Sequence, residues 1–261
     1  MVHTFGHIEK RIRFVISTFC MIALMLFSTF FFFDKVWVFI PVLVIAAYFF
    51  TFFSILEGIE KIEWFTLFLM PVLCTVAAYL FYFLFPVRWI TRIPFMFLYG
   101  FSMYAILLTS NIFNVGVDRS LQLYRAAFSV NYFYQTLLSF LIFNVIFSFK
   151  QNFAVNALLV FIIIFPLTMQ LMWSIKLKIH SEPYVRQYAF LISIMLAQLA
   201  SLISFVPVKS TIFALLITSC YYSISGLLYH YADQKLFKQT VREYVFVAGF
   251  VCIIVLLSIQ W

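Results

Sequence analysis

The sequence predicts an all-α fold, a polytopic bundle of about nine transmembrane helices, and two observations support this prediction. Long apolar runs recur along the whole chain, and the run 14–33 holds twenty residues without a charge. That length is about what the hydrocarbon core of a bilayer requires. In composition, 66% of the 261 residues are hydrophobic and 10% are charged, whereas a soluble domain carries about 25% charged residues. So few charges cannot cover the surface of a soluble protein of this size.

Short breaks that carry charged residues or prolines separate the apolar runs. They place the nine predicted spans at about 12–33, 36–56, 64–85, 89–110, 122–148, 153–175, 187–206, 210–229 and 243–260. The longest breaks, near 176–186 and 230–242, are about a dozen residues each. Because neither break can hold a soluble domain, the chain is predicted to form a single transmembrane domain, residues 1–261.

The first apolar run, 14–33, follows three cations, Lys10, Arg11 and Arg13, and so resembles a secretory signal peptide. Its apolar stretch is longer than the usual core of a signal peptide, and no small-residue cleavage motif follows it. We therefore expect an uncleaved first span.

The next three spans are bounded by charges and prolines. Asp34 and Lys35 precede the second span, and an acidic turn from Glu57 to Glu63 precedes the third. The fourth span contains Arg92 and Pro94, a cation and a helix breaker that are both unusual inside lipid. The sequence leaves open whether this span crosses the bilayer or is re-entrant.

The last five spans differ in their polar content. The fifth is the longest and carries several amides. The seventh and eighth carry small residues at helical spacing, and these residues are Ser193, Ala197, Ser201, Ser219, Ser223 and Gly226. Small side chains let two helix backbones approach closely, so we expect the seventh and eighth spans to pack against each other.

The distribution of Lys and Arg predicts a cytoplasmic N-terminus and a C-terminus outside, because cytoplasmic loops carry the excess of these residues. If the chain crosses the membrane at each predicted span, twelve of the 17 cations fall on the same side of the membrane as the N-terminus. They are Lys10, Arg11, Arg13, Lys61, Arg119, Arg125, Lys176, Lys178, Arg186, Lys235, Lys238 and Arg242. Five fall on the opposite side: Lys35, Arg88, Arg92, Lys150 and Lys209.

Several function classes lack their sequence signatures. The net charge of +8 forms no basic patch interleaved with aromatics, so nucleic acid is not an expected partner. Each of the four cysteines, Cys20, Cys74, Cys220 and Cys252, lies alone in an apolar run, which argues against a metal site or a disulfide framework. No nucleotide-binding, serine hydrolase or metalloprotease motif is present. We expect no cofactor and no metal.

The strongest polar pattern begins at the end of the fourth span. Asn111, Asn114 and Asp118 are three and four residues apart, so they share one face if the helix continues through them. Arg125 then begins the fifth span and could hold an anionic group or pair with Asp118.

The fifth span continues this pattern with a ladder of four-residue steps, Asn131, Gln135 and Ser139. Polar groups inside lipid are costly and mark substrate or ion pathways, although they also act as hydrogen-bonding glue between helices. The predicted binding site comprises six residues: Asn111, Asn114, Asp118, Arg125, Asn131 and Gln135.

The leading functional hypothesis is a non-enzymatic integral membrane protein, either a small permease-like transporter or a bundle that works with partners. One alternative is a membrane-embedded enzyme that acts on lipid-linked substrates, with Asp118 or His230 as the base. Another is a structural or assembly subunit of a membrane complex. The expected partners are anionic headgroups on the cytoplasmic side of the bilayer, and a partner helix or a second copy of the chain stays open.

Two short stretches, 110–115 and 123–127, have the sequences SNIFNV and LYRAA. They resemble uncharacterised multi-pass membrane proteins from bacteria with reduced gene sets. The resemblance covers about forty residues and implies a bacterial plasma membrane, the inner membrane, but no activity.

Overall fold

The computed structural model describes residues 9–31, 36–55, 64–85, 89–115, 121–176, 183–234 and 236–259. Within these ranges the chain forms nine α-helices and no strand. All nine are long and apolar enough to cross a membrane. The predicted all-α, polytopic fold is therefore confirmed. The orientation of the termini stays a prediction.

The helices of the described ranges agree with the predicted spans to within a few residues. Their bounds are α2 (Lys10–Phe31), α3 (Val36–Ile55), α4 (Trp64–Tyr82), α5 (Trp89–Val115), α6 (Leu121–Ser148), α7 (Phe153–Lys176), α8 (Pro183–Ile203), α9 (Ser210–Ala232) and α10 (Lys238–Leu257). The largest differences lie at the end of α5 and the starts of α8 and α10, where polar residues belong to the helix. Hydropathy detects only the apolar part of a helix, whereas backbone hydrogen bonding continues into the polar ends.

The fourth predicted span forms one continuous helix that is long and apolar enough to cross a membrane. α5 runs without interruption from Trp89 to Val115, with Pro94 in its second turn. Near the start of a helix the missing N–H of proline removes only one backbone hydrogen bond, so the helix continues.

The chain divides into two compact units, residues 1–134 and 135–261, and the division falls inside α6. Whether the whole chain acts as the predicted single domain stays a prediction. Each unit is described by itself below.

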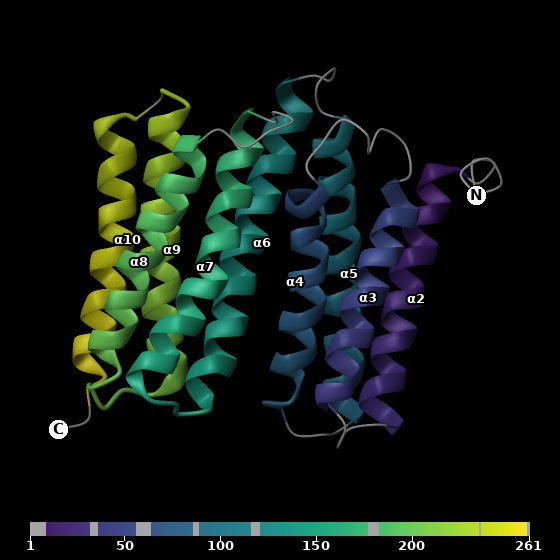
Figure 1. Ribbon diagram of the computed structural model, residues 1–261, viewed down its shortest axis with the longest axis horizontal. Coiled ribbons are helices and arrows are strands. Elements are labelled where there is room, and N and C mark those ends of the chain that lie inside the picture. The colour runs from purple at the N-terminus through teal and green to yellow at the C-terminus, as the bar shows by residue number, and fades with distance from the viewer. Residues whose placement is uncertain are drawn as a thin grey trace. The chain divides into compact units, whose positions relative to one another are not determined.

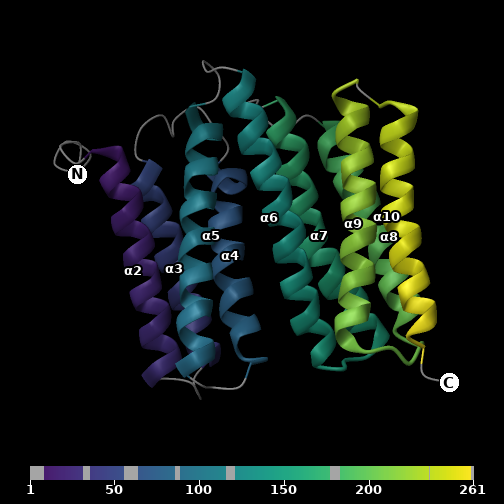
Figure 2. The ribbon, with the colours of Figure 1, turned by 180° about the vertical axis from the view of Figure 1, so that it is seen from behind.

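The first unit contains four helices, α2 to α5, that pack in sequence order, with α5 returning to α2 (Figures 1 and 2). Gly100 permits the approach of α5 to α2, because a Cβ at this position would overlap Cδ1 of Ile22 and would lie 3.1 Å from its Cγ1. The core of the unit includes Met21, Met25 and Met103, each fully buried.

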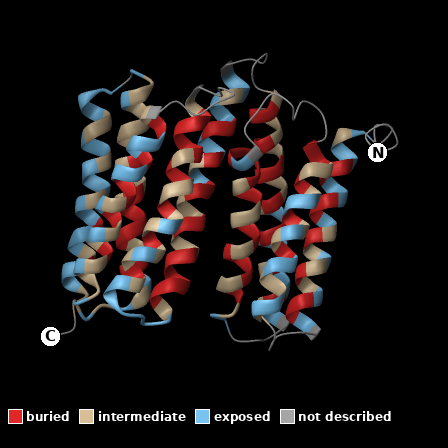
Figure 3. Ribbon diagram, viewed as in Figure 1, coloured by how far each residue is buried: buried red, intermediate tan, exposed pale blue. Residues whose placement is uncertain are grey.

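In the second unit α7, α8 and α9 pack against one another, and α10 packs along α9. α8 and α9 pack against each other, as predicted. Of the small residues behind that prediction, Ser223 instead bonds to Tyr244 O of α10 at 3.1 Å. α10 is the least buried of the described helices, as its pale blue surface in Figure 3 shows. Its outward side chains, among them Phe246, Phe250 and Ile253, are suited to contact with lipid.

Many serine and threonine side chains in both units bond to a carbonyl one turn earlier in their own helix. Thr75 bonds to Pro71 O at 3.0 Å, and Ser193 bonds to Ala189 O at 2.6 Å. These local bonds satisfy the hydroxyls where water is absent. A buried hydroxyl in these helices is therefore not by itself a binding group.

Candidate functional site

The predicted site residues on α5 lie in its last two turns. Asn114 is buried and Asn111 is half-buried. Among the described residues, Oδ1 of Asn111 has no hydrogen-bond partner although the atom is buried. Asp118 lies outside the described residues. Helix α5 thus places both amides, three residues apart, at the end of the span.

The predicted residues on α6 do not all share one face. Asn131 and Gln135 are buried, at 4% and 0% exposure, whereas Arg125 is exposed. Arg125 is six positions before Asn131. Because an α-helix has 3.6 residues per turn, this spacing places Arg125 on a different side of α6 from Asn131. A direct role for Arg125 at this face stays a prediction.

Gln135 is the centre of a hydrogen-bonded cluster in the second unit. Its Nε2 donates to Leu167 O at 3.2 Å and to Oε1 of Gln170. Its Oε1 accepts a hydrogen bond of 3.2 Å from the hydroxyl of Tyr221. Because Gln135, Gln170 and Tyr221 are all buried, one amide on α6 links the interiors of α7 and α9.

The predicted site did not include Gln170 and Tyr221. A signal for Gln170 was present, since an amide inside an apolar span is itself a candidate for function. Tyr221 carried no comparable signal, because it lies in a Tyr-rich stretch and is 86 residues from Gln135.

The cluster consists of neutral groups that both donate and accept hydrogen bonds. Ser139, one turn beyond Gln135, is also buried and bonds to Thr136 O at 2.8 Å. Two amides and a phenol can exchange hydrogen bonds with a polar solute.

The alternative catalytic base, His230, lies among aromatic rings near the end of α9. Its ring centroid is 5.1 Å from that of Tyr229 and 5.9 Å from that of Tyr244. Among the described residues, no group of three or more His, Cys, Asp or Glu side chains is arranged to hold a metal ion. Catalysis by His230 or Asp118 stays a prediction.

Arg92 shows how a cation is held near the start of α5 in the first unit. The residue is buried, its Nε donates to the Tyr82 hydroxyl at 3.0 Å, and its guanidinium lies 5.2 Å from the centroid of the Phe30 ring. A charge-assisted hydrogen bond and a cation–π contact both stabilise a partly desolvated guanidinium. These contacts explain how the fourth span accommodates an arginine.

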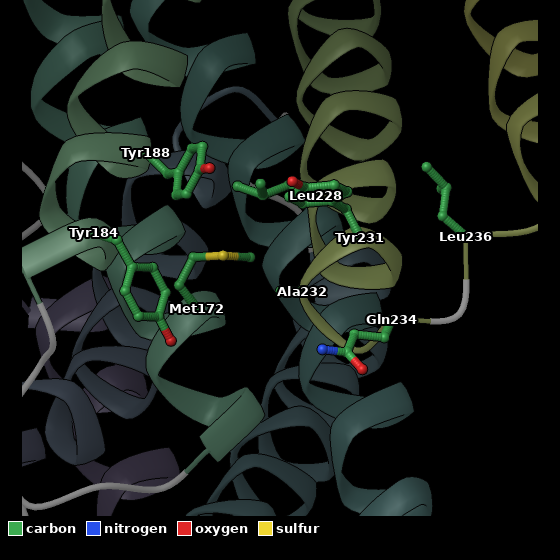
Figure 4. Close-up of a pocket in the computed structure, with 8 residues that line it drawn as sticks. All are labelled: Met172, Tyr184, Tyr188, Leu228, Tyr231, Ala232, Gln234 and Leu236. Atoms are coloured by element: carbon green, nitrogen blue, oxygen red, sulfur yellow. The ribbon is translucent and has the colours of Figure 1, made fainter.

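A pocket of about 530 Å³ opens at one end of the second unit (Figure 4). Its lining comes from α7, α8, α9 and the segment that follows α9. The lining residues are Met172, Tyr184, Tyr188, Leu228, Tyr231, Ala232, Gln234 and Leu236. The pocket combines three phenols and one amide with an apolar surface, and the predicted site included none of these residues.

Comparison with known proteins places the chain in a family. Residues 33–258 match the family model described as "Protein of unknown function (DUF5656)". The chain belongs to the DUF5656 family. This membership confirms the resemblance to an uncharacterised family of proteins, and the nine apolar helices of the described residues agree with a multi-pass membrane protein. No curated protein and no solved structure matches this DUF5656 chain.

Proposed function

We propose that this multi-pass membrane protein is a non-enzymatic, permease-like protein that binds a small polar solute at the buried face of α6. The observation that supports the proposal is the cluster around Gln135, which joins amides and a phenol from three helices in the interior of the second unit. A bacterial plasma membrane is the proposed location.

The chemistry of the cluster supports a binding role. Neutral amides and hydroxyls exchange one hydrogen-bond partner for another without separating charge, so a bound solute can replace the bonds that Gln135 makes to Gln170 and Tyr221. The competing explanation is that the cluster only joins helices, since such contacts contribute about 0.6 kcal/mol each in a membrane protein. The two explanations differ in whether water reaches the face of α6.

A cysteine-accessibility scan tests the proposal. Single cysteines replace Asn131, Gln135 and Ser139 in a full-length background without the four native cysteines, and a charged, water-soluble thiol reagent is applied to proteoliposomes. Val130 and Phe133, which are exposed on α6, serve as matched controls on the opposite faces. Variants at Asn131 and Ser139 keep the test valid if Gln135→Cys does not fold.

The proposal expects labelling at the three buried positions and protection at the two exposed ones, because the exposed positions face lipid. Lys150→Cys, in the exposed turn after α6, is the positive control for reagent activity. Protection of all three buried positions while Lys150→Cys reacts would show a dry face, and the cluster would then be a structural contact.

A partner-dependent role is a second candidate, and the packing of α10 favours it. α10 packs along α9, and a Cβ at Gly249 would meet no heavy atom of the described residues within 4 Å. A helix with an open small-residue position can receive another helix. Cross-linking between copies through the exposed Cys252, in a background without the other cysteines, tests for a second copy. Absence of cross-linked dimer across a range of protein-to-lipid ratios would argue against self-association through this face.

A further inference from the structure

The tyrosine-lined pocket of the second unit lies where membrane spans end. Tyr184 is the first residue of the span on α8, and Tyr231 and Ala232 are the last two residues of the span on α9. Tyrosine at such positions sits at the level of the lipid headgroups, with its ring toward the apolar region and its hydroxyl toward water. The pocket therefore faces the part of a bilayer where lipid phosphates are found.

We propose that this pocket binds the phosphate-bearing headgroup of an anionic glycerophospholipid. The inference does not depend on the proposed function, because the pocket shares no lining residue with the cluster around Gln135. It identifies a site for a lipid, rather than for a transported solute.

The lining offers polar groups for the headgroup of a lipid and apolar groups for its hydrocarbon part. The hydroxyls of Tyr184, Tyr188 and Tyr231 and the amide N–H groups of Gln234 are hydrogen-bond donors for phosphate oxygens. Met172 and the two lining leucines give the pocket an apolar surface for the glycerol backbone and the first acyl carbons. A volume of about 530 Å³ lies within the range of roughly 300–1,000 Å³ that small-ligand sites occupy.

Two of the three lining tyrosines lie on α8, and the third lies on α9. Tyr184 and Tyr188 are one turn apart on α8, and their ring centroids are 6.4 Å apart. Tyr231 comes from α9, and Figure 4 shows the Gln234 side chain directed toward the side where Met172 and Tyr184 lie. α8, α9 and the segment after α9 thus each contribute at least one hydrogen-bond donor to the pocket lining.

Gln234 has a backbone conformation that is unusual for a residue other than glycine. Its φ is 56°, in the left-handed region that glycine and asparagine occupy with less strain. The position directly follows Asp233, the C-cap of α9, where glycine is the usual choice. Glycine would remove the strain but would also remove the amide from the pocket, and a binding role for the amide accounts for glutamine at this position.

The charge of the surrounding sequence suits an anion. Among the described side chains of the two segments that supply the lining, three are cationic, Arg186, Lys238 and Arg242, and two are acidic, Asp233 and Glu243. Lys238 and Arg242 are exposed and one turn apart at the start of α10, where they line a separate hollow together with Gln239, Glu243 and Phe246. Cations close to a membrane surface attract anionic lipids.

Native mass spectrometry of the full-length protein, released from nanodiscs that contain phosphatidylcholine and a minority of phosphatidylglycerol, tests the assignment. The wild type should retain phosphatidylglycerol in preference to phosphatidylcholine. A variant with all three lining tyrosines changed to Phe keeps the rings and loses the hydroxyls. Its retention of phosphatidylglycerol should fall by about tenfold or more, because a hydrogen bond to a charged group typically contributes about a factor of ten to affinity. Tyr48→Phe, at an exposed tyrosine of the first unit, is the matched control.

A second variant keeps the test decisive if the triple variant does not fold. Gln234→Gly removes the amide and relieves the backbone strain, so it should fold and yet retain less phosphatidylglycerol. Lys150→Gly relieves a similar strain, at φ 48°, in a turn far along the sequence from the pocket, and should retain the lipid as the wild type does. Equal retention by Gln234→Gly and Lys150→Gly would overturn the role of Gln234.

Two competition experiments distinguish a lipid phosphate from a free phosphate as the ligand. Inorganic phosphate and soluble glycerophosphoglycerol are added to the lipid-bound wild type, and neither should displace the lipid at millimolar concentration. Displacement by inorganic phosphate alone would identify a free anion as the ligand and overturn the assignment to a lipid. Equal retention of the two phospholipids, or undiminished retention by the triple variant, would also overturn it.

Discussion

Replacing Gln135 by leucine should destabilise the second unit. The substitution keeps a side chain of similar length and removes the three hydrogen bonds that the amide makes: the two donated by Nε2 to Leu167 O and to Gln170, and the one accepted from Tyr221. Interhelical hydrogen bonds in a membrane protein contribute about 0.6 kcal/mol each on average. Three such bonds give an expected loss of about 2 kcal/mol in the free energy of unfolding.

The free energy of unfolding can be measured by titrating the full-length protein from mild detergent into sodium dodecyl sulfate and following helicity by circular dichroism. Phe133→Leu, at an exposed position two residues away on α6, controls for a change of apolar side chain and should shift the free energy by less than about 0.5 kcal/mol. A loss for Gln135→Leu no larger than that of the control would refute the inference that the cluster contributes to stability.

A double-mutant comparison separates the Tyr221 contact from the other two. Tyr221→Phe alone should cost about 0.6 kcal/mol, because it removes one hydrogen bond. In the Gln135→Leu background the same substitution should cost nothing further, since the bond no longer exists. Additive losses in the double variant would show that the tyrosine and the glutamine stabilise the protein independently.

Three further predictions follow from single contacts and backbone angles. Gly100→Val should destabilise the first unit by about 1–3 kcal/mol, because the added side chain overlaps that of Ile22 and forces it to repack. Gly249→Val, at an open position, should leave the free energy of unfolding nearly unchanged, and the same detergent titration measures both. Tyr82→Phe should lower stability by about 1.5–3 kcal/mol through loss of the hydrogen bond from the buried Arg92. An unchanged stability would mean that the other contacts of Arg92 hold the guanidinium without this bond. Lys150→Gly should raise stability by roughly 0.5–1 kcal/mol, because glycine relieves the left-handed φ at this exposed turn, and a lower melting temperature would contradict this.

The sequence by itself determined where the membrane helices lie. Whether a segment partitions into lipid depends on its own side chains, so apolar runs and charged breaks locate the nine helices of the described residues to within a few residues. The same local property leaves helix ends less certain, and α5 extends to Val115, five residues beyond its predicted end. The amides Asn111 and Asn114 thereby belong to the helix.

Only the tertiary structure decided which face of each helix is buried. In a soluble helix the polar face marks the outside, but a transmembrane helix is apolar toward lipid and toward its neighbours alike. The sequence therefore grouped Arg125 with Asn131 and Gln135, whereas rotation of α6 exposes the arginine and buries the two amides.

The tertiary structure also decided which polar groups meet. The partners of Gln135 are Gln170 and Tyr221, 35 and 86 residues away, and no local pattern encodes a contact over such separations. The tyrosine-lined pocket likewise forms only when the ends of α7, α8 and α9 come together. The sequence thus specifies which segments enter the membrane, because partitioning is local, and packing specifies the sites, because they are built from residues distant in the chain.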